Sequence, residues 1–390
     1  MDISYILNQL GEDSASFPKS MVPPIAQTSN FVFESVEDIR RAMADEFNAF
    51  IYSRGNNPVT AVLRQKLAAL EGAEDALVFG SGMGAIAAAV LAHVEQGAHV
   101  VCVAHPYSWT RKLLADFLPR FGVLTDFADG RDLKNLEHAI KGNTRLLYLE
   151  SPNTFSYDLQ DLRKVSDLAR SKGVVTAIDN SYATPIFQRP LDLGIDISIH
   201  SATKYLSGHS DVLAGVVCAS RKVIRRMFEQ EFMTLGGTIA PMNAWLMLRG
   251  LRSLKWRMER HFESAKKICG FLEQSPYVHQ VLYPFSPSFP QFELARQQMQ
   301  GAGSLMSIQL TNRSLRAIEA FCNRLKRFAI GVSWGGYESL VLPACAGIPA
   351  ADFNPAETSH RLIRLYIGWE DPECIIQDLQ QALEASSLEV

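Results

Sequence analysis

Short apolar runs alternate with helical segments through the first half of the chain, and this alternation limits the possible folds most strongly. Most runs are apolar at every position, which is typical of strands buried on both faces of a parallel sheet. Strands are predicted at Ala76–Phe79, His99–Val103, Arg145–Leu149, Val174–Ile178, Ile195–His200 and Leu213–Cys218. Helices are predicted at Pro58–Leu70, Met83–Val94, Leu133–Ile140 and Leu162–Lys172. We therefore predict an α/β protein with a large, mainly parallel sheet sandwiched by helices.

Three regions of the chain differ in pattern, and they define the expected domains. Residues 1–54 are irregular apart from a helical segment at Val36–Asp45, so we expect an arm that packs on a neighbouring subunit. Residues 55–245 carry the large sheet, and residues 246–390 form a smaller C-terminal α/β domain. The expected C-terminal segments are a long helical stretch at Met242–Leu272, a proline-rich break at Pro276–Pro290, and then Ser304–Leu310, Leu315–Cys322, Ile330–Trp334, Arg361–Gly368 and Pro372–Leu383.

Composition argues against several classes of protein. The 390 residues are 47% hydrophobic and carry a net charge of −3, so nucleic-acid binding has no electrostatic support. The six cysteines are scattered, without zinc-ligand spacing, which predicts no metal site and a reducing, cytoplasmic location. No apolar run is long enough to cross a membrane, so we expect no membrane partner.

A glycine cluster, Gly80–Gly84, follows one predicted strand and opens a helix. Backbone amides at such a helix start bind anions, which favours a phosphate site. A dinucleotide site is the first alternative, because Gly80, Gly82 and Ala85 match Gly-x-Gly-x-x-Ala. That site needs a carboxylate after the next strand, where this chain has His105 instead. Close packing of the turn is the second alternative.

The stretch from Ala177 to His209 places reactive groups at the ends of two consecutive predicted strands. Asp179 ends the first apolar run, and Ser201, Thr203 and Lys204 follow the second. The carboxyl ends of neighbouring parallel strands meet at one edge of a sheet, where ligands bind. Pyridoxal 5′-phosphate (PLP) requires such a set: an acid for its ring nitrogen, donors for its phosphate and a lysine for its aldehyde.

Each of these residues also has another interpretation. Asp179 could cap a helix. Ser201-x-x-Lys204 matches serine acyl-enzymes, but the Ser-Asp-Asn and Lys-Thr-Gly elements of that class are absent. Tyr107, after another strand, could stack on a cofactor ring or lie on the surface. A binding or scaffold protein that has lost catalysis is a further alternative, and the presence of both Asp179 and Lys204 argues against it.

The segments Asp179–Pro185, Pro190–Asp196 and Ser198–Asp211 resemble the signature of the Cys/Met-metabolism PLP enzymes of fold type I, the family of cystathionine lyases and synthases. The resemblance covers nearly the whole chain. It implies a fold type I PLP-dependent transferase-like fold with PLP as cofactor. The roles it implies are aldehyde binding and catalysis for Lys204, ring-nitrogen binding for Asp179, phosphate binding for Gly82, Met83, Ser201 and Thr203, and ring stacking with acid–base catalysis for Tyr107.

The resemblance also implies an assembly. Tyr52 and Arg54 match the pair that reaches the phosphate of a neighbouring subunit, and Tyr52 also belongs to the expected substrate site. This implies a homo-oligomer, a homotetramer built of active dimers.

Substrate residues follow from the same resemblance. Arg364 matches the arginine that holds the substrate α-carboxylate, for which a planar guanidinium is suited. Ser333 and Trp334 resemble the substrate-side loop of bacterial cystathionine β-lyases, whereas γ-acting members usually carry leucine there. The chain departs from the family's Glu-Ser-Pro-x-Asn-Pro at Asn153 and Thr154, either of which could replace the usual asparagine.

The resemblance implies a PLP-dependent carbon–sulfur lyase of trans-sulfuration. The leading expectation is β-elimination of cystathionine to homocysteine, pyruvate and ammonia. A methionine γ-lyase is disfavoured because Ser108 replaces the usual cysteine after the stacking tyrosine. The alternatives are cystathionine γ-lyase, cystathionine γ-synthase and O-acylhomoserine sulfhydrylase.

Overall fold

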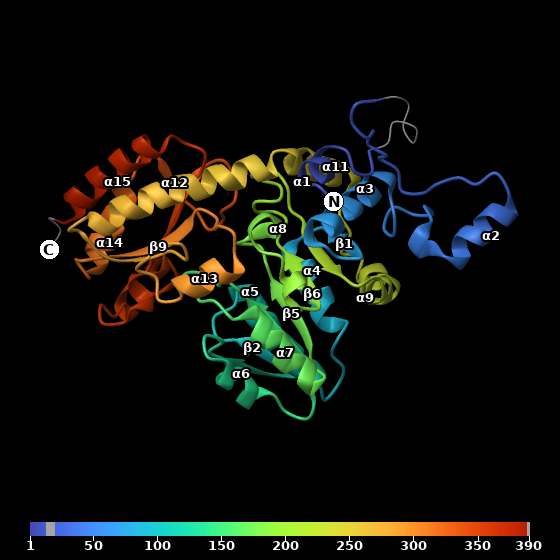
Figure 1. Ribbon diagram of the computed structural model, residues 1–390, viewed down its shortest axis with the longest axis horizontal. Coiled ribbons are helices and arrows are strands. Elements are labelled where there is room, and N and C mark those ends of the chain that lie inside the picture. Colours follow the sequence, from blue (N-terminus) through green and yellow to red (C-terminus); the bar gives the residue numbers. More distant parts are fainter. Residues whose placement is uncertain (13–19, 388–390) are drawn as a thin grey trace.

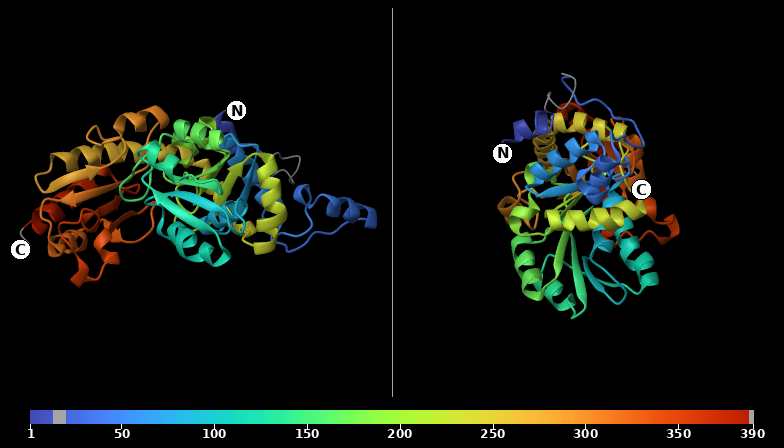
Figure 2. Two further views of the ribbon diagram at one scale, coloured as in Figure 1. Left: turned by 90° about the horizontal axis from the view of Figure 1, so that it is seen from below. Right: turned by 90° about the vertical axis from the view of Figure 1, so that its right-hand side faces the viewer.

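The computed structural model describes residues 1–12 and 20–387, which fold around two β-sheets. The sheets lie side by side along the long axis, with the N-terminal arm at one end and the C-terminus at the other (Figure 1). The same order of small sheet, large sheet and arm is seen from below (Figure 2). The predicted α/β fold, with a large sheet and a smaller C-terminal α/β unit, is confirmed.

The large sheet has seven strands in the order β1-β7-β6-β5-β4-β2-β3. Their bounds are β1 (Asp75–Phe79), β2 (His99–Val103), β3 (Leu124–Ala128), β4 (Thr144–Glu150), β5 (Val175–Asp179), β6 (Ile197–His200) and β7 (Gly215–Ala219). Five neighbouring strands, β6, β5, β4, β2 and β3, run parallel, while β7 is antiparallel to both of its neighbours. The carboxyl ends of β2, β4, β5 and β6 therefore meet at one edge.

Helices cover both faces of this sheet. They are α3 (Pro58–Glu71), α4 (Gly82–Leu91), α5 (Ser108–Lys112), α6 (Leu133–Ala139), α7 (Leu162–Lys172), α8 (Thr184–Phe187) and α9 (Arg221–Met227). Alternate residues of β1 show the two faces: Ala76 and Val78 share a core with α3, whereas Leu77 and Phe79 share a core with α4. A strand buried on both sides must be apolar throughout, as its sequence predicted.

The small sheet has five strands in the order β10-β11-β12-β9-β8. Its elements are β8 (Val278–Leu282), α13 (Phe292–Gln298), β9 (Leu305–Leu310), α14 (Leu315–Arg324), β10 (Phe328–Ile330), β11 (Ser339–Pro343), β12 (Ile363–Tyr366) and α15 (Pro372–Ser386). The predicted strand at Ile330–Trp334 is wrong, because β10 already ends at Ile330 and the chain continues as a loop. Within the described ranges, no helix has the length and apolar character needed to cross a membrane.

The long helical segment predicted at Met242–Leu272 is two helices, α11 (Pro241–Arg252) and α12 (Leu254–Gln274). The expected domain boundary after residue 245 falls inside α11, so we propose that the two domains divide at Ser253. The buried Arg257 holds this joint, since its guanidinium donates to the carbonyls of Tyr205 (2.6 Å) and Gly250 (2.8 Å).

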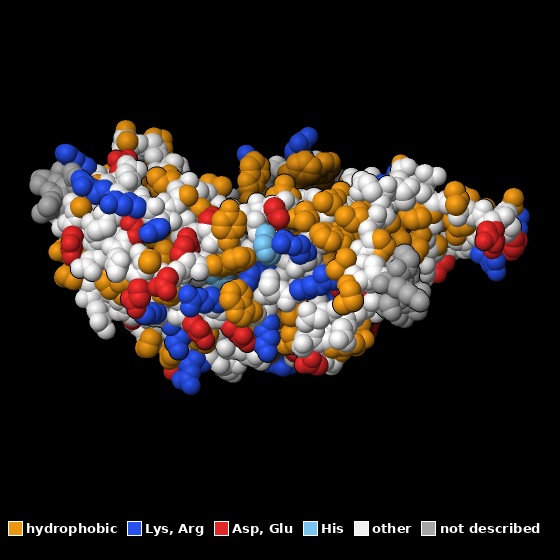
Figure 3. All heavy atoms as spheres, turned by 90° about the horizontal axis from the view of Figure 1, so that it is seen from above, with side chains coloured by type: hydrophobic (Ala, Val, Ile, Leu, Met, Phe, Trp, Pro, Cys, Tyr) orange, Lys and Arg blue, Asp and Glu red, His pale blue; other side chains and the backbone are white. Residues whose placement is uncertain are grey.

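The N-terminal arm packs on the body at both of its ends and projects from it in the middle. It begins with α1 (Ile3–Asn8), which packs on α3, and continues to α2 (Val36–Ala44), a helix without a buried residue. Figure 1 shows α2 projecting from the body. Val32 and Met43 are 93% and 66% exposed. Hydrophobic side chains are also exposed on the arm-bearing half of the face in Figure 3. Exposed apolar surface of this kind marks an interaction site.

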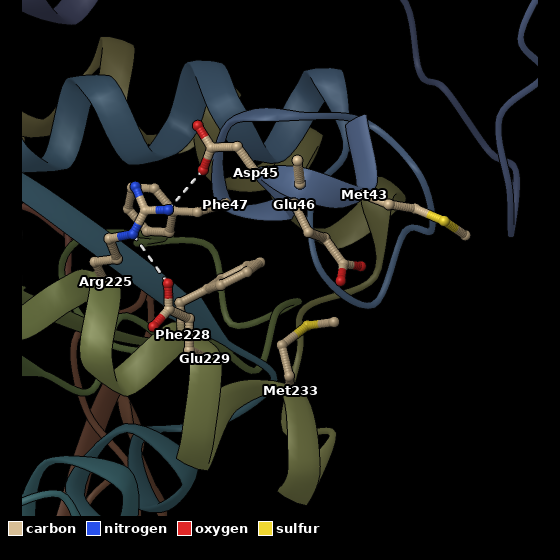
Figure 4. Close-up of a pocket in the computed structure, with 9 residues that line it drawn as sticks. Met43, Asp45, Glu46, Phe47, Arg225, Phe228, Glu229 and Met233 are labelled. Carbon is tan, nitrogen blue, oxygen red and sulfur yellow. Dashed lines mark hydrogen bonds and ion pairs between the residues drawn. The ribbon is translucent and has the colours of Figure 1, made fainter. Parts of the chain in front are cut away.

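The base of the arm rests on the π-helical turn Phe228–Phe232. Phe47 is buried there, edge-on against Phe228 at 5.2 Å between ring centroids. A cavity of about 250 Å³ lies at this junction (Figure 4). Arg225 crosses it, bonded to Asp45 (2.7 Å) and Glu229 (2.9 Å). None of the predicted site residues lines this cavity. We therefore assign it to the packing of the arm on the body.

Candidate active site

The ends of β5 and β6 lie side by side, because Asp179 pairs with Ile199 in the parallel register. The Ser181 side chain connects the ends of these two strands. Its hydroxyl donates to Asp179 Oδ1 at 2.5 Å and accepts from the Ser201 amide at 2.6 Å. The sequence analysis assigned Ser181 no role in the site. The available signal was its position two residues after Asp179, the acid at the end of a predicted strand. The structure thus brings together the predicted acid and the first predicted phosphate ligand.

Asp179 is a buried carboxylate with one oxygen free. Oδ1 accepts from the amide and hydroxyl of Ser181, whereas Oδ2 has no hydrogen-bond partner in the described chain. Burial raises the pKa of Asp179, while the Ser181 hydrogen bonds and the charges of His200 and Lys204 lower it. The alternative in which Asp179 caps a helix is wrong, since the next helix starts after Ala183 without a side-chain cap. The free oxygen can accept from a protonated ring nitrogen.

A second buried carboxylate, Glu150, lies next to Asp179. The two residues pair in the register of β4 and β5. Glu150 Oε2 accepts from the Tyr107 amide (2.7 Å), and Oε1 accepts from the Thr154 amide (3.0 Å). Burial, followed by the charge of Asp179, raises the pKa of Glu150 to about 8. Glu150 therefore ties together the loops that follow β2 and β4, a role that depends on strand register.

Lys204 lies in the turn after β6, beneath a loop of the small domain. Its Nζ donates to Ser333 Oγ at 2.7 Å and lies 5.4 Å from the centre of the Trp334 ring. Burial lowers the pKa of Lys204 to about 8; the charge of Arg364 lowers it further, and that of Asp179 opposes the shift. A lysine with a lowered pKa can be neutral and nucleophilic.

The loop reaches Lys204 through a close backbone approach at Gly335. This residue has a φ of 94°, in the left-handed region, and a Cβ there would lie 2.7 Å from Lys204 Cα. Only glycine fits this position. The loop between β10 and β11 thus carries Ser333 and Trp334 to the lysine.

The start of α4 offers unpaired amides. Ser81 caps the helix by accepting from the Gly84 amide at 3.0 Å, and the amides of Gly82 and Met83 have no partner in the described chain. A Cβ on Gly82 would lie 2.8 Å from Ser201 Oγ, so the Ser201 hydroxyl faces the helix start. Thr203 is less free, because its hydroxyl already exchanges hydrogen bonds with Ala214.

These groups fit PLP on the chemistry of the donor set. The free Asp179 oxygen suits the ring nitrogen, the α4 amides with Ser201 suit a phosphate, and Lys204 suits the aldehyde. The dinucleotide alternative finds no carboxylate after β2, where the chain has His105.

Tyr107 lies at the end of β2 and starts α5. Burial raises its pKa, and the charges of Asp179 and Glu150 raise it further while Arg364 opposes them. The Tyr107 amide donates to Glu150 Oε2 at 2.7 Å, which holds this residue beside the ends of β4 and β5, and Tyr107 is 43% exposed.

Arg364 lies on β12 with one edge of its guanidinium engaged. Nη2 donates to the carbonyls of Val332 (2.6 Å) and Ser333 (3.3 Å), while Nε and Nη1 have no hydrogen-bond partner in the described chain. Burial lowers the pKa of Arg364, but guanidinium groups remain charged in proteins. Nε–H and the Nη1 hydrogens lie on opposite sides of Cδ, so each offers a separate charge-assisted donor to a carboxylate.

Asn153 and Thr154, the two candidates to replace the family's usual asparagine, differ in their hydrogen bonds. Asn153 Oδ1 accepts from the Ser156 hydroxyl (2.8 Å) and the Asp158 amide (2.9 Å), so this side chain closes its own loop. The Thr154 hydroxyl has no partner among the described residues. Thr154, rather than Asn153, is therefore free to face a ligand.

Tyr52 and Arg54 do not join the site within one chain. Both are exposed on the arm, with the guanidinium of Arg54 5.5 Å from the Tyr52 ring. In the part of the chain that is described, neither contacts Lys204 or Asp179.

Comparison with known proteins identifies the class. The sequence profile of the family described as Cys/Met metabolism PLP-dependent enzyme matches residues 6–384. An L-methionine γ-lyase of Treponema denticola is 39% identical over 374 residues (94% of this chain, 92% of the relative). A cystathionine γ-lyase of Bacillus subtilis is 36% identical over 365 residues (93% of each). The crystal structure of metB from Corynebacterium glutamicum superposes with a TM-score of 0.91 at 30% identity, covering 99% of this chain and 98% of that one.

Fold and donor set together define a PLP-dependent enzyme of fold type I. The chain belongs to the Cys/Met metabolism family of PLP-dependent enzymes. The predicted family, PLP cofactor and assignment to the PLP-dependent lyases are confirmed. The relatives named above are γ-lyases, whereas the sequence favoured a β-lyase.

Proposed function

We propose that this enzyme cleaves the carbon–sulfur bond of cystathionine by β-elimination, producing homocysteine, pyruvate and ammonia. The observation that carries the proposal is the position of Lys204 Nζ, which is bonded to Ser333 Oγ and covered by the Trp334 indole.

The indole restricts where the lysine amine can act. β-Elimination requires the removal of a proton from Cα alone, whereas γ-elimination also requires a second proton to be taken from Cβ. Trp334 packs edge-on against the buried Tyr205 at 5.3 Å between ring centroids, so it cannot easily move aside. An amine held by Ser333 and Trp334 favours transfer at one carbon atom.

The proposed roles follow from the free groups of the site. Bound PLP supplies an electron sink for the substrate's Cα. Arg364 holds the α-carboxylate through an unpaired N–H group of its guanidinium, and Lys204 Nζ removes the Cα proton. Asp179 Oδ2 keeps the ring nitrogen protonated, and the Gly82 and Met83 amides bind the phosphate together with the Ser201 hydroxyl. Thr203 joins them when its hydroxyl turns from the Ala214 carbonyl to the phosphate. Tyr107 stacks on the ring and supplies a proton to the departing sulfur.

A second candidate is γ-elimination, which the names of the relatives favour. Methionine γ-lyases of several bacteria are 37–39% identical to this chain over most of its length, and two cystathionine γ-lyases are 35–36% identical. Cystathionine γ-synthase and O-acylhomoserine sulfhydrylase chemistry would use the same cofactor and the same carboxylate site.

Product identification separates these reactions. The purified PLP-loaded enzyme is incubated in turn with cystathionine, methionine and an O-acylhomoserine with or without a thiol. Pyruvate with homocysteine from cystathionine supports β-elimination. Cysteine with 2-oxobutyrate contradicts it and supports the γ-lyase alternative. A thioether formed only from the O-acylhomoserine would assign a synthase or sulfhydrylase.

The proposal includes a homotetramer of active dimers in the cytoplasm. The arm exposes apolar residues, and the side chains of Tyr52 and Arg54 are exposed on it and contact each other, which supports a role at a neighbouring subunit's phosphate. The free cysteines suit a reducing compartment. Sedimentation should give the tetramer mass, and Arg54→Ala should weaken PLP binding without altering the Lys204 environment.

A further inference from the structure

The loop after β4 holds two aromatic residues in an unfavourable backbone conformation. Phe155 and Tyr157 have φ values of 63° and 58°, in the left-handed region that bulky side chains avoid. Such outliers persist only where the surrounding structure fixes them, and they cluster at functional sites.

Hydrogen bonds on both sides fix this loop. Within it, Asn153 Oδ1 accepts from Ser156 and Asp158. Beyond it, the Gln291 side chain accepts from the Leu159 amide and donates to the Leu159 carbonyl, each at 2.8 Å. Gln291 belongs to the small domain, so both domains hold the loop in place.

The unusual backbone turns the two rings in different directions. Tyr157 is fully buried and packs on Tyr182 at 5.6 Å between ring centroids. Phe155 is only half-buried, and its ring lies 5.3 Å from the centre of the Arg364 guanidinium. A ring needed only for the core would be buried as Tyr157 is.

The Phe155 ring further restricts the position of the Arg364 guanidinium. One edge of the guanidinium is bonded to the Val332 and Ser333 carbonyls, and Phe155 lies against the group from another element. A cation beside an aromatic ring is attracted to it, more strongly where water is excluded. The unpaired N–H groups on Nε and Nη1 are then held in fixed directions.

We propose that Phe155 is a positioning residue for Arg364, holding its guanidinium so that an unpaired N–H group, on Nε or Nη1, meets an α-carboxylate. This rests on the proposed role of Arg364 in carboxylate binding. The usual family sequence has proline at this point of the Glu-Ser-Pro-x-Asn-Pro segment, so the ring is this chain's own contribution to the carboxylate site.

The test compares two small ligands that carry no sulfur leaving group. Calorimetry measures the binding of glycine and of glycinamide, which lacks the α-carboxylate, to the PLP-loaded enzyme. Phe155→Leu should weaken glycine binding about 3- to 30-fold, the range expected for loss of a cation–aromatic contact, and should leave glycinamide binding nearly unchanged. Phe155→Tyr, which retains the ring, should keep the wild-type preference for glycine. Phe155→Met provides a second aliphatic variant.

A matched control removes a similar contact elsewhere. Phe117 lies 5.4 Å from the Arg120 guanidinium on the surface, and Phe117→Leu should change neither affinity. Equal weakening of both ligands by Phe155→Leu, or unchanged glycine binding, would overturn the proposal. Because neither ligand undergoes elimination, a wild-type enzyme that cleaves no sulfur amino acid would refute the proposed function but not this one.

Discussion

The Lys204 amine donates a 2.7 Å hydrogen bond to the hydroxyl of Ser333, a residue 129 positions further along the chain. Lys204 follows β6 of the large sheet, whereas Ser333 lies in the loop between β10 and β11 of the small one. The active site is therefore completed only when the two domains are docked. A change in their relative position would alter the contacts and the pKa of the lysine.

Replacing Lys204 by alanine should abolish turnover while the protein still binds PLP through its phosphate. A positioned proton-transfer group contributes about 10²–10⁴-fold to the rate, and this lysine is also expected to hold the aldehyde. Product release and PLP content after gel filtration measure the two effects. Lys222→Ala, on the exposed start of α9, is the matched control. Wild-type turnover by Lys204→Ala would refute the assigned role.

Replacing Arg364 by alanine should raise KM and lower kcat together. Loss of a charge-assisted contact to the α-carboxylate should reduce kcat/KM about 10- to 100-fold, and the mispositioned Cα should slow the chemical step. Steady-state kinetics on cystathionine checks this, with Arg296→Ala on the surface of α13 as the control. An unchanged KM would remove Arg364 from the substrate site.

The Glu150 carboxyl should make the stability of the PLP-free protein depend on pH. Its pKa is raised from 4.5 to about 8, so between these values the folded state binds more protons than the unfolded state. The free energy of unfolding therefore receives a contribution that is complete below about pH 4.5 and is lost as pH rises towards 8.

Glu150→Gln should flatten that part of the pH profile, because the amide does not titrate. Denaturant unfolding between these pH values measures the slope, and Glu259→Gln, exposed on α12, should leave it unchanged. An identical slope in wild type and Glu150→Gln would mean that Glu150 ionises normally. Activity should also fall, because glutamine cannot accept from both the Tyr107 and Thr154 amides.

The sequence predicts those strands that are buried on both faces, because such strands are rich in apolar residues. Strands such as β2 and β6 are buried throughout, and their apolar runs marked them. The predictions missed β3 and β8 because both are largely exposed or half-buried and have mixed sequences. Arg257 is fully buried because carbonyl oxygens compensate its charge, and no local sequence pattern indicates this.

Without the family resemblance, the candidate site could also be predicted only where its residues follow a recognisable strand. Asp179, Ser201 and Lys204 could be predicted because each follows a recognisable strand, and parallel strands end at one edge. Glu150 acquires its role from the register between β4 and β5, which no local pattern encodes. Phe155 reaches Arg364 through a left-handed backbone at a residue that gives no sign of it in sequence.

Trp334→Leu should shift the products from cystathionine towards cysteine and 2-oxobutyrate. Leucine keeps an apolar contact with Tyr205 but leaves space beside Lys204 Nζ, so the amine can reach Cβ as well as Cα. The measurement is the ratio of pyruvate to 2-oxobutyrate, which a general loss of activity would not change. Trp256→Leu, at an exposed position of α12, is the control. If wild type already forms 2-oxobutyrate alone, or if the ratio is the same in Trp334→Leu, the indole does not decide between β- and γ-elimination.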